Sequence, residues 1–189
     1  MNRFPNRFRI LYLVTIVIIG QLFSLSCNLD RCKTVACYHG GYCQLGNCVC
    51  PIGYEGPSCQ TLMREKFLGN WIVFEKGNMS FSAQYPVTID TLNTTSITQV
   101  RILNFNDSFK NAIYATVNGY NITVPSQETN KRITFGGGYI YFTTGVNYNQ
   151  YSIINMAYEV IDSVNNTLIN DYGYDSVADG TKMSVWNKQ

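Results

Sequence analysis

The chain of 189 residues has few charged side chains, 14% in all, and one histidine, His39. Three of its 14 basic residues precede Cys27 and none of its 12 acidic residues does, so the remainder carries 11 positive charges against 12 negative ones. Proteins that bind nucleic acids need a basic surface that displaces the counterions of the phosphates. This charge balance therefore argues against a nucleic-acid partner.

Cysteine and histidine are both missing after Cys59. A Ser-His-Asp triad, a Cys-His nucleophile and a histidine-based zinc site therefore cannot be assembled there. We expect the protein not to be an enzyme, with no catalytic residue, no metal site and no cofactor.

Two sequence features still call for a chemical interpretation. The glycine run 136–138 is not followed by the Lys-Ser/Thr of a phosphate-binding loop, which favours a hairpin turn. Asp171, Asp175 and Asp179 are four residues apart, but Gly173 and Gly180 favour a solvated loop over an acid pair or a calcium site. A carboxylate-dependent glycan hydrolase is therefore the least favoured alternative function.

Residues 1–26 have the features of a secretory signal peptide. Three arginines lie in residues 1–9, and an apolar run at residues 10–20 is too short for a transmembrane helix. Leu25-Ser26-Cys27 resembles the lipobox of bacterial lipoproteins, which implies that Cys27 is lipidated and that residues 27–31 form the mature N-terminus and its tether. The alternatives are a retained signal anchor and a spare thiol at Cys27.

Six of the seven cysteines fall within residues 32–59, which leaves Cys27 without a partner. So short a segment cannot enclose a useful hydrophobic core, and we expect disulfides to take the place of a core. The sequence alone allows many pairings. Zinc is the alternative because His39 lies inside the cluster, but secretion would oxidise these thiols.

The cluster CKTVACYHGGYCQLGNCVCPIGYEGPSC resembles an EGF-like module. The final part of that family's pattern is supplied by Cys50, Gly53, Tyr54, Gly56 and Cys59. The short gap between Cys43 and Cys48 is similar to tenascin- and integrin-type modules. The resemblance implies bridges between Cys32 and Cys43, between Cys37 and Cys48, and between Cys50 and Cys59, and we expect no bound metal.

Residues 60–66 are predicted as a linker to a second domain at residues 67–189, where the hydrophobic pattern has a period of two. A helical turn is expected near residues 62–67. Asn118-Gly119 between alternating runs predicts a type I′ hairpin. About eight to nine antiparallel strands are expected, separated by turn residues. Their ranges are 68–76, 80–92, 96–105, 112–117, 122–124, 131–135, 139–144, 151–161 and 181–188.

An antiparallel sheet of this length is expected to close into an up-and-down barrel or, as an alternative, to form a β-sandwich. Gly69 and Trp71 in the sequence KFLGNW resemble the Gly-x-Trp entrance of lipocalin-like barrels, which implies that Trp71 plugs one end of the barrel. The succession of lipid signal, short EGF-like module and barrel resembles surface lipoproteins of the Bacteroidetes. Asp90-Thr91-Leu92, Asp162-Ser163-Val164 and Asp175-Ser176-Val177 look like O-glycosylation sites of those bacteria.

We therefore expect a mainly β, non-enzymatic cell-envelope protein at the outer membrane or cell surface. Its lipid would hold it on the membrane, the EGF-like module would act as a stalk, and the barrel would bind a partner. A protein, a glycan and a small apolar ligand are the candidate partners. The second hypothesis is a lipocalin-like carrier that holds a small apolar ligand inside the barrel.

Overall fold

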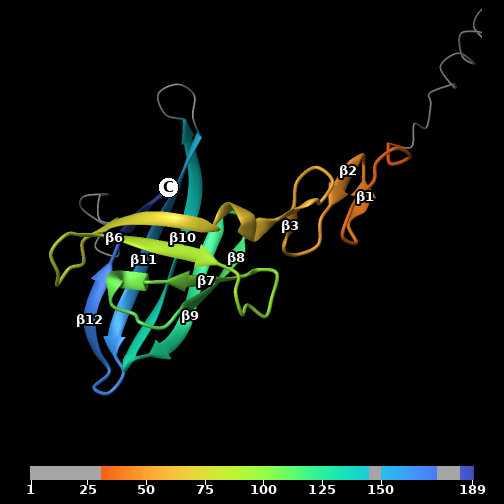
Figure 1. Cartoon of the computed structure of the whole chain (residues 1–189). Helices are drawn as coiled ribbons and strands as arrows, with labels where there is room; N and C mark the ends of the chain where they lie inside the picture. Colours follow the sequence, from red (N-terminus) through yellow and green to blue (C-terminus); the bar gives the residue numbers. More distant parts are fainter. Residues whose placement is uncertain (1–30, 145–149, 174–183) are drawn as a thin grey trace, which may run out of the picture.

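A computed structural model describes residues 31–144, 150–173 and 184–189. Figure 1 shows a narrow N-terminal module beside a barrel of antiparallel strands. Within the described residues, no helix is long and apolar enough to cross a membrane. The prediction of a mainly β protein is confirmed, and its second domain closes into a barrel instead of forming a sandwich.

The N-terminal module consists of two short hairpins braced by disulfides. Strands β1 (Tyr42–Gln44) and β2 (Asn47–Val49) pair with each other, as do β3 (Tyr54–Glu55) and β4 (Thr61–Leu62). The bridges join Cys32 to Cys43, Cys37 to Cys48 and Cys50 to Cys59, the same pairs that the EGF-like resemblance implies. Disulfides of this kind stabilise a fold mainly by restricting the unfolded chain.

The barrel is formed by strands that follow the chain order and then close on themselves. Neighbouring strands pair antiparallel from β5 to β11, and β13 pairs with both β11 and β5 to complete an eight-stranded ring. Strand β12 pairs with the part of β11 that extends beyond β13. The bounds are β5 Gly69–Glu75, β6 Ala83–Asp90, β7 Gln99–Leu103, β8 Ile113–Asn118, β9 Asn121–Thr129, β10 Arg132–Thr144, β11 Gln150–Asp162, β12 Thr167–Tyr172 and β13 Ser184–Lys188.

Alternation along each strand places the core inside the ring. Trp71 and Val73 of β5 are fully buried, whereas Asn70 and Phe74, at the alternate positions, are exposed. Every second residue of β11 from Ile154 to Val160 is buried in the same way. This period of two is the pattern from which the strands were predicted.

The segment predicted as a linker is structured. Residues 61–62 form β4, and residues 63–66 form the 3₁₀ turn η1 (Met63–Lys66), which lies within the helical turn expected at residues 62–67. The Arg64 guanidinium donates to the backbone oxygens of Ser96 and Gln99 in the barrel. The module and the barrel are therefore joined by hydrogen-bonded structure on both sides of η1.

The predicted Asn118-Gly119 turn forms one residue further along the chain. Asn118 pairs with Asn121, so Gly119 and Tyr120 are the central residues of the hairpin. Gly119 has a φ of 59°, and Tyr120 is absent from the residues with positive φ. A single positive φ at the first central position fits a type II′ turn instead of the predicted type I′ turn.

The prediction of a hairpin turn at the glycine run 136–138 is wrong. Residues 132–144 form one continuous strand, β10, in place of the two predicted strands at 131–135 and 139–144. Gly136 and Gly138 lie opposite Tyr158 and Met156 of β11. A Cβ atom on Gly138 would lie 2.0 Å from the backbone oxygen of Asn155, so glycine is needed here for close approach between strands.

This close approach predicts different costs for neighbouring glycines. Gly138→Ala should lower the free energy of unfolding by at least about 2 kcal/mol, because the paired strands would have to separate. Gly137→Ala is the matched control, since its Cβ would come no closer than 3.0 Å to the backbone oxygen of Ile122. Urea unfolding of both variants measures the difference, and equal stabilities would contradict the steric explanation.

Candidate functional site

The two ends of the barrel differ in chemistry. Trp71 lies at the end that faces the module, where it is fully buried and its indole nitrogen donates to the backbone oxygen of Phe67 at 2.9 Å. Gly69, which begins β5, has a φ of 123°, a conformation that favours glycine. The two residues of the Gly-x-Trp resemblance therefore lie together, where Trp71 and Phe67 fill this end of the barrel.

Large side chains fill the barrel between its ends. A side chain that lined an empty cavity able to admit water would keep some accessible surface, yet none remains on the largest inward-facing residues. The fully buried residues with no accessible surface include Phe67, Trp71, Val73, Val100, Ile102, Phe105, Ile113, Ile154, Met156, Tyr158 and Trp186. The described residues therefore leave little room for the internal ligand that the carrier hypothesis requires.

A buried carboxylate occupies the end of the barrel away from the module. Glu75, the last residue of β5, is 7% exposed. Its Oε1 accepts hydrogen bonds from the Tyr85 hydroxyl at 2.5 Å and the Asn106 amide at 3.1 Å. Its Oε2 accepts from the hydroxyls of Tyr158 at 2.7 Å and Ser184 at 2.6 Å. These four donors compensate for the loss of hydration that burial of a carboxylate entails.

Further hydrogen bonds and aromatic contacts hold these donors in place. The Trp186 indole nitrogen donates to the Ser184 hydroxyl at 2.8 Å. The Tyr158 ring stacks on Tyr172 with 4.6 Å between centroids, and Phe105 lies at the same distance from Tyr158. The carboxylate is therefore surrounded by rings that exclude water and by hydroxyl groups with fixed directions.

Charge and burial keep the phenols protonated. Burial raises the pKa of Tyr85, and the neighbouring Glu75 charge raises it further. The pKa of Tyr158 is raised well above its ordinary value by the same two causes, with burial again the larger. Both phenols therefore remain hydrogen-bond donors to Glu75 across the physiological pH range.

Asn106 is the donor that does not come from a strand. It belongs to η2 (Phe105–Asp107), a short turn between β7 and β8. Asn106, Asp107 and Asn104, the residue just before η2, all have positive φ. Asn and Asp tolerate this region better than other residues with a side chain. Its amide donates to both Glu75 and the Tyr158 hydroxyl, so η2 covers the carboxylate.

The period-two pattern contained a signal for Glu75 that the sequence analysis missed. Trp71, Val73 and Glu75 are alternate residues of one strand, so the side of β5 that faces the core ends in an acid. The four donors are distant in sequence, and no local pattern brings them together.

Of the three aspartates considered for glycan hydrolysis, the described residues include Asp171 alone. The loop prediction was wrong at Asp171, which lies in β12, where its carboxylate accepts a hydrogen bond from the Asn78 amide. Asp175 and Asp179 lie outside the described residues. In the described part of the chain, no three His, Cys, Asp or Glu residues are grouped as a metal site would require.

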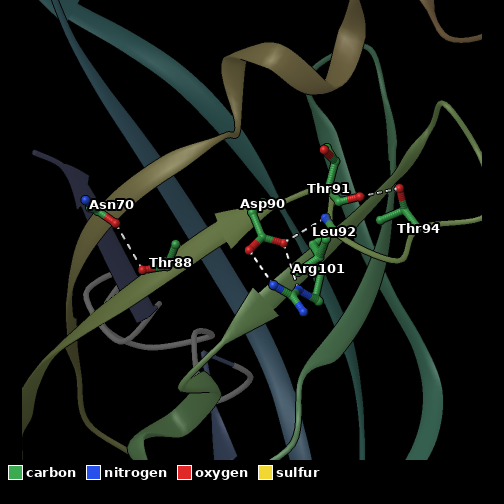
Figure 2. Close-up of polar contacts among 7 residues, drawn as sticks. All are labelled: Asn70, Thr88, Asp90, Thr91, Leu92, Thr94 and Arg101. Carbon is green, nitrogen blue, oxygen red and sulfur yellow. Dashed lines mark hydrogen bonds and ion pairs between the residues drawn. The ribbon is translucent and has the colours of Figure 1, made fainter.

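Two of the three Asp-Ser/Thr-aliphatic triplets are turns stabilised by their own aspartate. Figure 2 shows the Asp90 carboxylate accepting from the Leu92 backbone nitrogen and from the Arg101 guanidinium. Asp162 accepts from the Val164 nitrogen in the same way. An aspartate that binds the nitrogen two residues later is typical of a turn. The triplet Asp175-Ser176-Val177 lies outside the described residues.

Comparison with known proteins gives one weak similarity. Fibropellin-1 of Strongylocentrotus purpuratus is 27% identical over 118 residues, which cover 56% of this chain and 11% of Fibropellin-1. This chain therefore spans about a tenth of that relative's length. No family model and no solved structure matches the chain. The similarity to this EGF-like homologue agrees with the three disulfides of the module.

The Glu75 network predicts that removal of the Glu75 charge destabilises the fold. Glu75→Gln should lower the free energy of unfolding by about 1–3 kcal/mol, because an NH₂ group would replace one oxygen that accepts two hydrogen bonds. Glu128→Gln is the control, since Glu128 is exposed on β9. Urea unfolding at neutral pH measures both variants. A Glu75→Gln protein as stable as the parent would show that the network contributes no net stability.

The Asp90–Arg101 ion pair predicts a dependence of stability on pH. Hydrogen bonds from Arg101, followed by the Leu92 nitrogen, hold the pKa of Asp90 below its ordinary value. The ionised carboxylate therefore stabilises the fold above the unfolded-state pKa of about 3.9, and this stability is lost as the pH falls through the lower folded-state pKa. The stability deficit of Asp90→Asn should accordingly be larger at pH ~7 than at pH ~2.5 in urea titrations. A deficit that does not change with pH would show that ionisation of Asp90 does not stabilise the fold.

Proposed function

We propose that this chain is a non-enzymatic, lipid-anchored protein of the cell envelope, placed at the outer membrane or cell surface. The EGF-like module holds the barrel at a fixed distance from the membrane, and the outer surface of the barrel binds a protein or glycan partner. The observation that carries this proposal is the structured junction between the module and the barrel. A barrel joined to the module by a flexible linker would not need such a junction.

Lys66 is the central residue of this junction. Its ammonium group donates to the Glu55 carboxylate of the module at 2.6 Å and to the Gly119 backbone oxygen of the barrel at 3.0 Å. It also lies 4.3 Å from the centre of the Tyr120 ring. Because the Lys66 side chain is only 10% exposed, its charge is held between the two parts of the molecule.

Other contacts on the two sides of η1 restrict the angle between module and barrel. The Met63 backbone nitrogen donates to the Gly53 oxygen of the module, and the Met63 sulfur accepts from the Gly119 nitrogen of the barrel. Gly53 also lies against Ile97, and a Cβ at residue 53 would come within 2.5 Å of that side chain. The module is therefore suited to transmit the orientation of the membrane-proximal chain to the barrel.

The filled interior supports a binding role for the outer surface. Residues that would line a calyx are packed against one another, and both oxygens of Glu75 are already occupied by two donors each. A carboxylate whose lone pairs are all engaged is poorly placed to act as a nucleophile or general base. These features favour an interaction protein over both a carrier of a small apolar ligand and a hydrolase.

The fate of Cys27 tests the anchoring part of the proposal. In protein purified from its native membrane, mass spectrometry should find a mature chain that begins at Cys27 and carries acyl chains. Cys27→Ser should shift the protein from the membrane to the soluble fraction, because it removes the sulfur to which the lipid would be attached. Ser26→Ala, which keeps a small residue before Cys27, should leave the protein on the membrane. An unmodified Cys27 in membrane-purified protein would refute the lipid anchor.

A further inference from the structure

The turn between β1 and β2 has an unusual residue at its tip. Gln44 pairs with Asn47, so Leu45 and Gly46 form a two-residue loop. Their φ angles are 52° and 91°, and a hairpin turn with two positive φ angles is of type I′. Asn or Gly normally occupies the position of Leu45, because a longer side chain is strained in the left-handed region.

Leu45 is unfavourable for two separate reasons. It is the only aliphatic side chain with positive φ among the described residues, most of the others being Asn or Asp. It is also 76% exposed, so little packing against the described residues compensates for the strain. A strained, exposed apolar side chain of this kind indicates a role in an interaction outside the fold.

The nearness of Arg31 establishes where this tip lies in the module. The side chain and backbone oxygen of Arg31, the first described residue, lie within 4 Å of a Cβ built on Gly46. The tip therefore lies where the chain enters the module. Figure 1 places β1 and β2 at the end of the module away from the barrel. Arg31 is four residues from Cys27, a span of at most about 14 Å.

We propose that the tip, Leu45-Gly46, inserts into the surface of the phospholipid bilayer and sets the orientation of the module on the membrane. This inference rests on the proposed lipid anchor at Cys27, which holds the tip near the headgroups. Leu45 enters the boundary between headgroups and acyl chains, where it loses contact with water. Arg31, which is exposed beside the tip, and Lys33, which is exposed two residues further along the chain, contact the phosphates of the headgroups.

The short tether favours a membrane over a soluble protein as the occupant. A partner protein would have to fit into the space between the module and the bilayer, which the four-residue spacing keeps narrow. The lipid surface, by contrast, is already within reach of Leu45. The structured junction at Lys66 would then carry the orientation fixed by two membrane contacts, the lipid and the tip, to the barrel.

Quenching of tryptophan fluorescence by brominated lipids tests the insertion. Leu45→Trp is compared with Phe81→Trp, because Phe81 is 94% exposed in the loop between β5 and β6 at the opposite end of the molecule. Trp71 and Trp186 are buried in the barrel and give the same background in both variants. Lipidated full-length protein is placed in vesicles of phosphatidylcholine with phosphatidylglycerol, with and without bromine on the acyl chains.

We expect the bromine-dependent loss of fluorescence to be several-fold larger for Leu45→Trp than for Phe81→Trp. Equal quenching in protein that floats with the vesicles would overturn the insertion and leave the lipid anchor intact, whether the tip then faces solvent or a protein. Protein that does not float and has an unmodified Cys27 would overturn the anchor and the insertion together. The two failures are therefore distinguishable.

A measurement on the unmodified sequence guards against misfolding of the variants. In nanodiscs with spin-labelled lipids, the methyl resonances of Leu45 should broaden, whereas those of Leu92, which is 59% exposed on the barrel, should not. Broadening of neither leucine would overturn the proposal even if the variants fail to fold.

Discussion

A single buried carboxylate links the strands that close the barrel. Glu75 of β5 receives hydrogen bonds from Ser184 of β13 and Tyr158 of β11, which are the strands that complete the ring. Tyr85 of β6 and Asn106 of η2 extend the same network to the opposite side of β5. An apolar residue at this position would leave several buried donors unpaired, at a cost of about 1–3 kcal/mol for each. The negative charge of Glu75 is thus stabilised by neutral hydrogen-bond donors from several elements of the chain.

Alternation of side chains predicted most strands, because burial on one face leaves a local pattern with a period of two. The same reasoning failed at residues 136–138, where glycine relieves crowding between strands instead of forming a turn. It also missed β12, where apolar Leu168 and Ile169 are partly exposed and the alternation is weak. Local composition does not show which strand will approach a glycine closely, since that depends on pairing across the sheet.

The disulfide module was predicted by spacing and family resemblance, whereas its attachment to the barrel was not. Residues 60–66 have no composition that distinguishes a linker from a structured junction. Their role becomes visible only when the acceptors of Arg64 and Lys66 are known, and several of these are backbone oxygens. The Glu75 site is a similar case, because its donors are ordinary Tyr, Ser and Asn side chains whose positions are set by strand register.

The sharing of Lys66 between the two parts has a consequence for how this protein can be recombined. A chimera that exchanges the module at residue 60 would separate the Lys66 ammonium from Glu55 and leave a nearly buried cation with one backbone acceptor. Loss of a hydrogen bond between charged groups commonly costs about 1.5–3 kcal/mol, and less where one group is partly solvated, as Glu55 is here. Module and barrel are therefore not independent units for domain shuffling, and a transplantable segment must carry Glu55, η1 and the hairpin at Gly119 together.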